Sequence, residues 1–134
     1  TKQPPDIGNG AYTVLIPAVD TDGNDIAGVR APMVEAPLGT YTGWNLRARG
    51  QGEGYMHEFT GSYLPLPETE AVRRSTGDSR RSIVDRYGDA DGYVRAMVSA
   101  AKRLVEDGLM LEEDVDRIAA AAADWGRPLH DVRL

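Results

Sequence analysis

The sequence contains no cysteine among its 134 residues. Disulfide bridges, thiolate metal sites and a cysteine nucleophile are therefore excluded. Basic side chains are also few, because 15 lysines and arginines stand against 21 acidic residues and leave a formal net charge of -6. Nucleic-acid binding depends on clustered lysine and arginine side chains that neutralise phosphates. We therefore expect no nucleic-acid partner.

Long hydrophobic runs are absent as well. No apolar stretch approaches the roughly 20 residues that a membrane-spanning helix requires, so we expect no membrane partner. The length fits one domain with a modest core. The numbering begins at Thr1 rather than at methionine. We interpret this start as the product of cleavage, of separate coding or of the boundaries chosen for expression.

The N-terminal part has the composition of an arm followed by a β-hairpin. Residues 1–10 combine two prolines with two glycines, which predicts an extended linker or arm. Residues 11–19 are rich in β-branched and aromatic side chains and predict a strand. Asp22-Gly23 lies at the centre of a turn, and residues 26–30 supply a return strand. We therefore predict a hairpin over 11–30.

The turn also places Asp20, Asp22 and Asn24 at alternate positions, as in a calcium-binding loop. Such a loop needs glycine at its sixth position and glutamate at its twelfth. Asp25 and Ala31 occupy those positions here. The pattern therefore favours a turn, and we predict neither a metal site nor a cofactor.

Prolines and glycines interrupt the segment 31–67 so often that it is predicted to be mostly loop with short strands. A loop region of this length is uncommon in a self-contained domain, and when ordered it usually binds a ligand or packs on a larger body. Residues 68–126 instead predict helices. The fold class is therefore an α+β segment, with an N-terminal hairpin, a long loop region and a helical C-terminal half.

Capping signals and apolar spacing divide the helical half into four helices. The first opens at 67–70, and the second, around 83–87, takes Asp78 or Ser79 as its cap. Asp91 caps the third, whose apolar residues recur at helical spacing as far as Gly108. The fourth starts at 112–114 and carries apolar residues as far as Trp125, with Gly126 and Pro128 beyond. We expect the last two helices to form an antiparallel pair.

No sequence motif in this chain identifies a catalytic residue. The Gly-x-Ser-x-Gly motif, which places a serine nucleophile on a sharp strand-to-helix turn, is absent. His57 and His130 lie at no spacing typical of metal binding or of a base beside its nucleophile. Thr1 would need to begin a rigid strand to act as an N-terminal nucleophile, yet it is followed by Lys-Gln-Pro-Pro. We therefore assign no catalytic residue.

The stretch 40–47 holds the candidate substrate-binding residues Tyr41, Trp44, Asn45 and Arg47. The two aromatics can supply flat apolar contact, while the amide and the guanidinium can orient a carbonyl or a carboxylate. The alternative is that the aromatics anchor the long loop to the core and Arg47 binds loop carbonyls.

Several segments in a fixed order resemble one large bacterial family, generally called alpha/beta-hydrolase-domain proteins. They are Val14-Leu15-Ile16-Pro17-Ala18-Val19-Asp20, Asp22-Gly23-Asn24, Ala27-Gly28-Val29-Arg30, Pro37-Leu38-Gly39 through Trp44-Asn45-Leu46-Arg47, Gly61-Ser62-Tyr63-Leu64-Pro65, Gly77-Asp78-Ser79-Arg80, Arg86-Tyr87-Gly88 and Tyr93-Val94. The resemblance covers nearly the whole chain and points to the C-terminal portion of the family.

The resemblance implies a single C-terminal segment, 11–134, that completes a larger α/β-hydrolase-type fold. Family members resemble serine hydrolases whose nucleophile and catalytic histidine lie upstream of this region. The expected function is thus part of an esterase-like serine hydrolase acting on a small-molecule carboxylic ester. The expected partner is a larger chain or upstream segment that carries the catalytic serine.

Two alternatives from other classes remain. The chain can be a free-standing non-catalytic module, for instance a homodimer that covers its exposed apolar loop surface with a second copy. It can also be a small-molecule binding protein that uses Tyr41 and Trp44.

Overall fold

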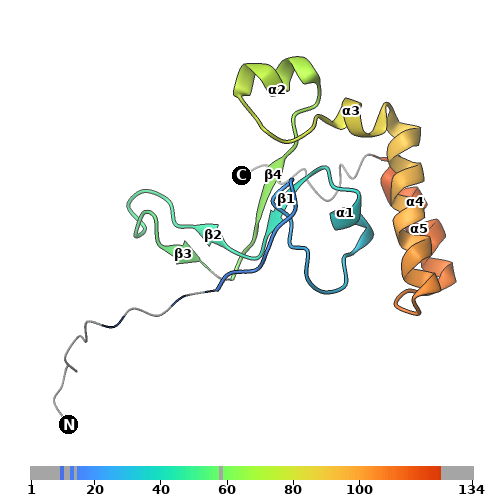
Figure 1. The fold of residues 1–134 in the computed structure, drawn as a ribbon, viewed down its shortest axis with the longest axis horizontal. Helices are drawn as coiled ribbons and strands as arrows, with labels where there is room; N and C mark the ends of the chain where they lie inside the picture. Colours follow the sequence, from blue (N-terminus) through green and yellow to red (C-terminus); the bar gives the residue numbers. More distant parts are fainter. Residues whose placement is uncertain (1–9, 11–12, 14, 58, 125–134) are drawn as a thin grey trace, which may run out of the picture.

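The computed structural model describes residues 10, 13, 15–57 and 59–124. In these residues two short antiparallel ladders lie beside a helical region, which confirms the α+β class (Figure 1). The elements in chain order are α1 (Pro32–Glu35), β1 (Gly39–Thr42), β2 (Asn45–Leu46), β3 (Met56–His57), β4 (Ser62–Pro65), α2 (Glu70–Thr76), α3 (Ile83–Tyr87), α4 (Ala90–Glu106) and α5 (Glu112–Ala123). None of these helices is long and apolar enough to cross a membrane.

The core of the molecule lies between α1, α3, α4 and α5. In α4 the buried residues Tyr93, Met97, Ala100 and Ala101 recur at helical spacing, as the sequence pattern predicts. The short connection 107–111 then returns the chain, and α5 packs along α4 as the expected antiparallel pair (Figure 1). The main buried cluster consists of Ala36, Leu38, Tyr93, Met97 and Ala122.

The caps of α3 and α4 differ from the prediction. Ser82, whose hydroxyl accepts from Asp85 N at 3.2 Å, caps α3. Asp78 cannot take that place because its carboxylate bonds Arg80. Asp89 caps α4 by accepting from Gly92 N at 2.7 Å, two residues before the predicted Asp91. The predicted end of the last helix at 125–128 lies outside the described residues.

Of the predicted hairpin over 11–30, the described residues show the turn and the pairing next to it. Val19 and Asp25 form one bridge, and Ile26 N donates to Ala18 O at 3.1 Å, while residues 26–30 form no regular strand. Arg30 turns inward, where it donates to Asp20 Oδ2 at 2.6 Å and to Val34 O at 2.9 Å. These bonds hold the end of the segment beside α1. Residues 11, 12 and 14 lie outside the described part of the chain.

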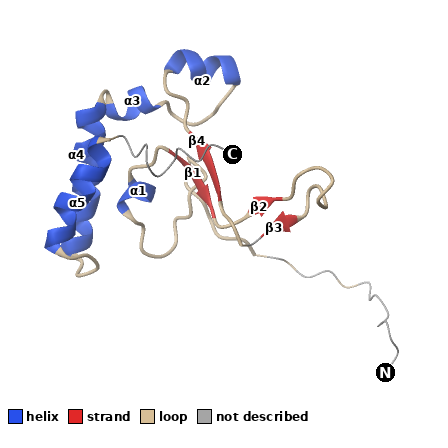
Figure 2. Ribbon diagram, turned by 180° about the vertical axis from the view of Figure 1, so that it is seen from behind, coloured by secondary structure: helices blue, strands red, loops and turns tan. Residues whose placement is uncertain are grey.

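The segment 31–67 contains short strands, as predicted, and they form two separate ladders. β1 pairs with β4, with Tyr41 opposite Tyr63, and β2 pairs with β3, with Asn45 opposite His57. We call residues 44–57 and 59–60 the β2–β3 ribbon, which extends away from the helices (Figure 2). It is joined to the body through β1 and β4, so the candidate stretch 40–47 begins in the body and ends in the ribbon.

Candidate functional site

Tyr41 belongs to the body of the molecule. Its ring lies 5.2 Å from that of Tyr63 on β4, and a second tyrosine pair, Tyr87 and Tyr93, packs at 5.2 Å between α3 and α4. Burial raises the pKa of the Tyr41 phenol well above its usual range and raises that of Tyr93 to about 12. These phenols therefore stay neutral at physiological pH and serve as packing groups.

Trp44 lies at the corner where β1 gives way to the ribbon, and it is 46% exposed. Two side chains hold this corner through its carbonyl oxygen. Thr42 Oγ1 donates to Trp44 O at 2.5 Å, and Ser62 Oγ donates to it at 2.9 Å. The backbone of Trp44 is thus held in place, while its indole ring remains accessible to solvent.

Asn45 and Arg47 lie in the ribbon, beside His57 of the opposite strand. An open groove of about 300 Å³ is lined by residues of both strands, of the loop between them and of the segment after β3. Its polar lining residues are Asn45, Arg47, Gln51, His57 and Thr60. The structure therefore places two of the four candidate residues in one groove, puts Trp44 at the near corner and separates Tyr41 from them.

The loop that closes the groove is shaped by its own backbone bonds. Gln51 N donates to Ala48 O at 3.0 Å, and Tyr55 N donates to Gly52 O at 3.1 Å. Gly52 has a φ of 83°, in the left-handed region that favours glycine. With the loop turned in this way, Gln51 lines the groove together with Arg47.

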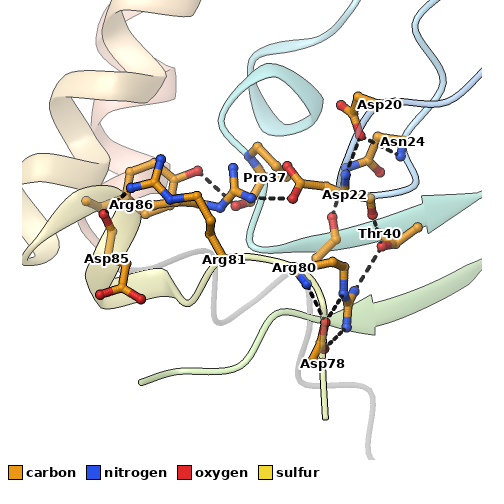
Figure 3. Close-up of polar contacts among 12 residues, drawn as sticks. Asp20, Asp22, Asn24, Pro37, Thr40, Asp78, Arg80, Arg81, Asp85 and Arg86 are labelled. Atoms are coloured by element: carbon orange, nitrogen blue, oxygen red, sulfur yellow. Dashed lines mark hydrogen bonds and ion pairs between the residues drawn. The ribbon is translucent and has the colours of Figure 1, made fainter. Parts of the chain in front are cut away.

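A buried polar cluster that the sequence patterns missed lies where the 20–24 turn, β1 and α3 meet (Figure 3). We call Asp22, Asn24, Thr40, Arg80 and Arg86 the polar junction. Arg86 forms an ion pair with Asp22, and Thr40 Oγ1 donates to Asp22 O. Arg80 donates to Thr40 Oγ1 and to Leu64 O, each at 2.9 Å. The junction fastens three segments that are far apart in sequence.

Asn24 is the most enclosed member of the polar junction, with an exposed fraction of 0%. Its Nδ2 donates to Gly39 O at 3.1 Å, and its Oδ1 accepts from Tyr41 N at 2.8 Å. Leu38 O, on the neighbouring position of β1, accepts from Leu66 N on the β4 side. Asn24 therefore satisfies the edge of β1 that faces away from β4, in the place of a third strand.

The acidic residues of the turn are engaged by the protein itself. Burial alone would raise the pKa of Asp20, but hydrogen bonds from Arg30 and from the N–H groups of Asn24 and Asp22 lower it overall. Within the described ranges no group of three or more acidic or histidine side chains is placed to bind a metal ion. The turn interpretation of 20–25 is thus consistent with the contacts, because each candidate ligand has a structural partner.

Three of the five described serines donate to nearby groups. Ser62 bonds Trp44 O, Ser75 bonds Val72 O at 2.9 Å, and Ser82 donates to Asp85 Oδ2 at 2.6 Å. His57 instead has Thr60 as its neighbour, with 3.3 Å between Nδ1 and Oγ1. In the part of the chain that the structure describes, no serine hydroxyl bonds a histidine, which is the pair that nucleophilic hydrolysis requires.

A comparison with protein-family models gives one match, described as "Alpha/beta hydrolase domain", over residues 2–120. No curated protein matches the sequence. No solved structure matches it either. The matched range includes the turn, both ladders, the polar junction and all of α4.

Proposed function

The chain belongs to the alpha/beta hydrolase domain family, and from this premise we propose that it forms the C-terminal part of a serine hydrolase acting on small carboxylic esters. The match over residues 2–120 is the observation that carries the proposal. Family membership indicates a hydrolase, while the sequence contains no Gly-x-Ser-x-Gly. We infer that the nucleophile lies in upstream polypeptide or in a larger partner chain.

The exposed apolar side chains support a larger partner. Leu15 and Ile16 are 88% and 83% exposed. In the ribbon, Leu46 and Met56 face each other across the ladder and are 57% and 58% exposed. A two-stranded ribbon is only marginally stable in water unless its apolar face packs on another body. An apolar face of this kind, beside a polar one, is characteristic of an interaction surface.

In this proposal the ribbon forms one wall of the substrate pocket. Trp44 supplies apolar contact at the corner, while Asn45 and Arg47 supply hydrogen bonds to the oxygen atoms of the substrate. Tyr41 contributes from beneath through its packing with Tyr63. The chain then acts by positioning the substrate and completing the fold, and the reaction takes place on the serine of the partner.

The first experiment labels the native protein with a fluorophosphonate probe, which reacts with activated serines. We expect the label on a polypeptide other than residues 1–134, in the same chain or in a co-purifying one. A single species of 14.5 kDa with no larger companion, or the absence of any labelled serine, would refute the proposal and favour a free-standing module.

The second experiment tests the wall itself. Trp44→Ala should lower kcat/KM for a 4-nitrophenyl ester by about tenfold, since one good apolar contact contributes about 1–3 kcal/mol. Arg49→Ala, a change in the same loop but outside the groove, should leave kcat/KM unaltered. Equal activities for the two variants, with both proteins folded, would leave Trp44 as a packing residue only.

A further inference from the structure

Among the described residues that line the ribbon groove none is acidic, although the chain has 21 acidic residues. Arg47 provides a positive charge, and Asn45, Gln51, His57 and Thr60 provide groups that can donate hydrogen bonds. Arg47 is the charged side chain among these described lining residues, in a chain whose net charge is -6. A positive charge with hydrogen-bond donors around it suits an anion.

Arg47 differs from most arginines of this protein in its bonding partners. Elsewhere in the described residues the arginines bond a carboxylate or a backbone carbonyl, for instance Arg80 with Asp78 and Arg86 with Asp22. Within the same ranges Arg47 and Arg49 have no ion pair and no side-chain hydrogen bond. Of these two, only Arg47 lines the groove.

The neighbouring amide is oriented by its own backbone. Asn45 Oδ1 accepts from Leu46 N at 2.8 Å. This bond occupies the acceptor of the side chain, so the Nδ2 group, a donor, remains for a ligand. The Asn45 position lies opposite His57 in the ladder, which brings the amide and the imidazole to the same face of the ribbon.

We propose that this groove binds a small carboxylate, with Arg47 pairing the two carboxylate oxygens and Asn45 donating a further hydrogen bond. A planar guanidinium matches a planar carboxylate in a two-bond arrangement. The volume of about 300 Å³ is at the lower end for small-molecule sites, which suits a short-chain acid.

Phosphate fits the groove less well. A phosphate site usually offers several free backbone N–H groups or more than one positive charge. Here the N–H groups of Gln51, Gly54 and Tyr55 are used within the loop, by Ala48 O, Arg47 O and Gly52 O. Among the described lining side chains one guanidinium and neutral donors face the ligand, a set that matches the single charge of a carboxylate.

In the proposed hydrolase this selectivity defines the substrate class. This step rests on the proposed function. If the chain is part of that hydrolase, the preferred ester carries a second, free carboxylate, as in a half-ester of a dicarboxylic acid. Arg47 and Asn45 bind that carboxylate and are positioning residues, since they bind a part of the substrate remote from the reacting carbonyl.

The binding test uses the native protein and needs no catalytic activity. Isothermal titration calorimetry compares butyrate with butyramide, an uncharged analogue of similar shape. We expect butyrate to bind at least about tenfold more tightly than butyramide. Arg47→Gln should remove this preference, and Asn45→Asp should abolish butyrate binding because it places a negative charge beside Arg47. Arg49→Gln is the control and should change the dissociation constant by no more than about twofold.

Three outcomes would overturn the proposal: equal binding of butyrate and butyramide, equal losses in Arg47→Gln and Arg49→Gln, or tighter binding of inorganic phosphate than of butyrate. Circular dichroism of each variant verifies that it is folded.

A kinetic test then separates this inference from the proposed function. With an active protein, Arg47→Gln should lower kcat/KM for 4-nitrophenyl hydrogen succinate at least about tenfold more than for 4-nitrophenyl butyrate. Ester hydrolysis without this difference refutes the substrate class and leaves the hydrolase proposal standing. Carboxylate binding in a protein that hydrolyses no ester refutes the hydrolase proposal and leaves the carboxylate site standing.

Discussion

Replacing Asn24 by alanine tests whether a single side chain takes the place of a third strand at the edge of β1. The amide makes two hydrogen bonds, to Gly39 O and from Tyr41 N, in a place where Asn24 is 0% exposed. Alanine leaves both backbone groups without their partner. An unsatisfied buried polar group costs about 1–3 kcal/mol. Because the Tyr41 N–H is only partly buried, we expect the free energy of unfolding to fall by about 2–4 kcal/mol.

The assay is urea unfolding of the purified protein followed by circular dichroism. With an m-value of about 1–3 kcal/mol/M, the midpoint should fall by about 1–2 M while the slope stays the same. Asn45→Ala is the matched control, because the Asn45 amide is exposed and bonds only the adjacent Leu46 N. It should cost no more than about 0.5 kcal/mol. Equal losses in the two variants would refute the role given to Asn24.

Two further predictions concern close packing and ionisation in the same region. Gly39→Ala should destabilise the protein by about 1–3 kcal/mol, because a Cβ there would lie 2.3 Å from the Tyr63 ring. Gly43→Ala is the control, since a Cβ at that position would have nothing within 4 Å. Equal urea midpoints for the two variants would contradict the prediction. Hydrogen bonds from the Arg80 side chain lower the pKa of Asp78 to about 2, below the value of about 3.9 in the unfolded chain. The stabilisation is therefore present above about pH 4 and lost as the pH falls towards 2. Asp78→Asn should flatten the decrease in unfolding free energy over this window, and an unchanged acid profile would show that the pair does not contribute.

The helical half is the part that local sequence signals predict well. The apolar spacing from Tyr93 to Ala101 gives the buried face of α4, and the acidic turn at 112–114 gives the start of α5. These signals act within one or two helical turns, so they do not depend on distant residues. The cap assignment at Asp78 fails because its carboxylate bonds the side chain of Arg80, only two positions along the chain, instead of the start of α3.

The hairpin shows the opposite case. The run of β-branched residues and the Asp-Gly turn predict two paired strands, and the turn does form. Beyond the bridge Val19↔Asp25 and the bond from Ile26 N to Ala18 O, the described residues 26–30 form no regular strand, and Arg30 bonds Asp20 and Val34 O instead. The β pattern describes side chains that fit a sheet surface and leaves open which partner they meet.

The candidate site is divided in the same way between sequence and structure. The composition of 40–47 is sufficient to single out Tyr41, Trp44, Asn45 and Arg47, and the order of short segments is sufficient to indicate the family. Only the fold shows that Tyr41 packs in the body while Asn45 and Arg47 lie in the ribbon groove with His57. Their grouping depends on the register of β2 against β3, a contact between residues about ten positions apart.

The sequence by itself determined the charge, the absence of thiol chemistry, the helices and the family to which the chain belongs. Each of these depends on composition or on neighbours along the chain. The tertiary structure alone decided that Asp22 meets Arg86, that Asn24 completes the edge of β1, and that Arg47 lies in the ribbon groove with Asn45 and His57. Such contacts join segments whose separation in sequence carries no local signal, because each side chain finds its partner only when the backbone has folded.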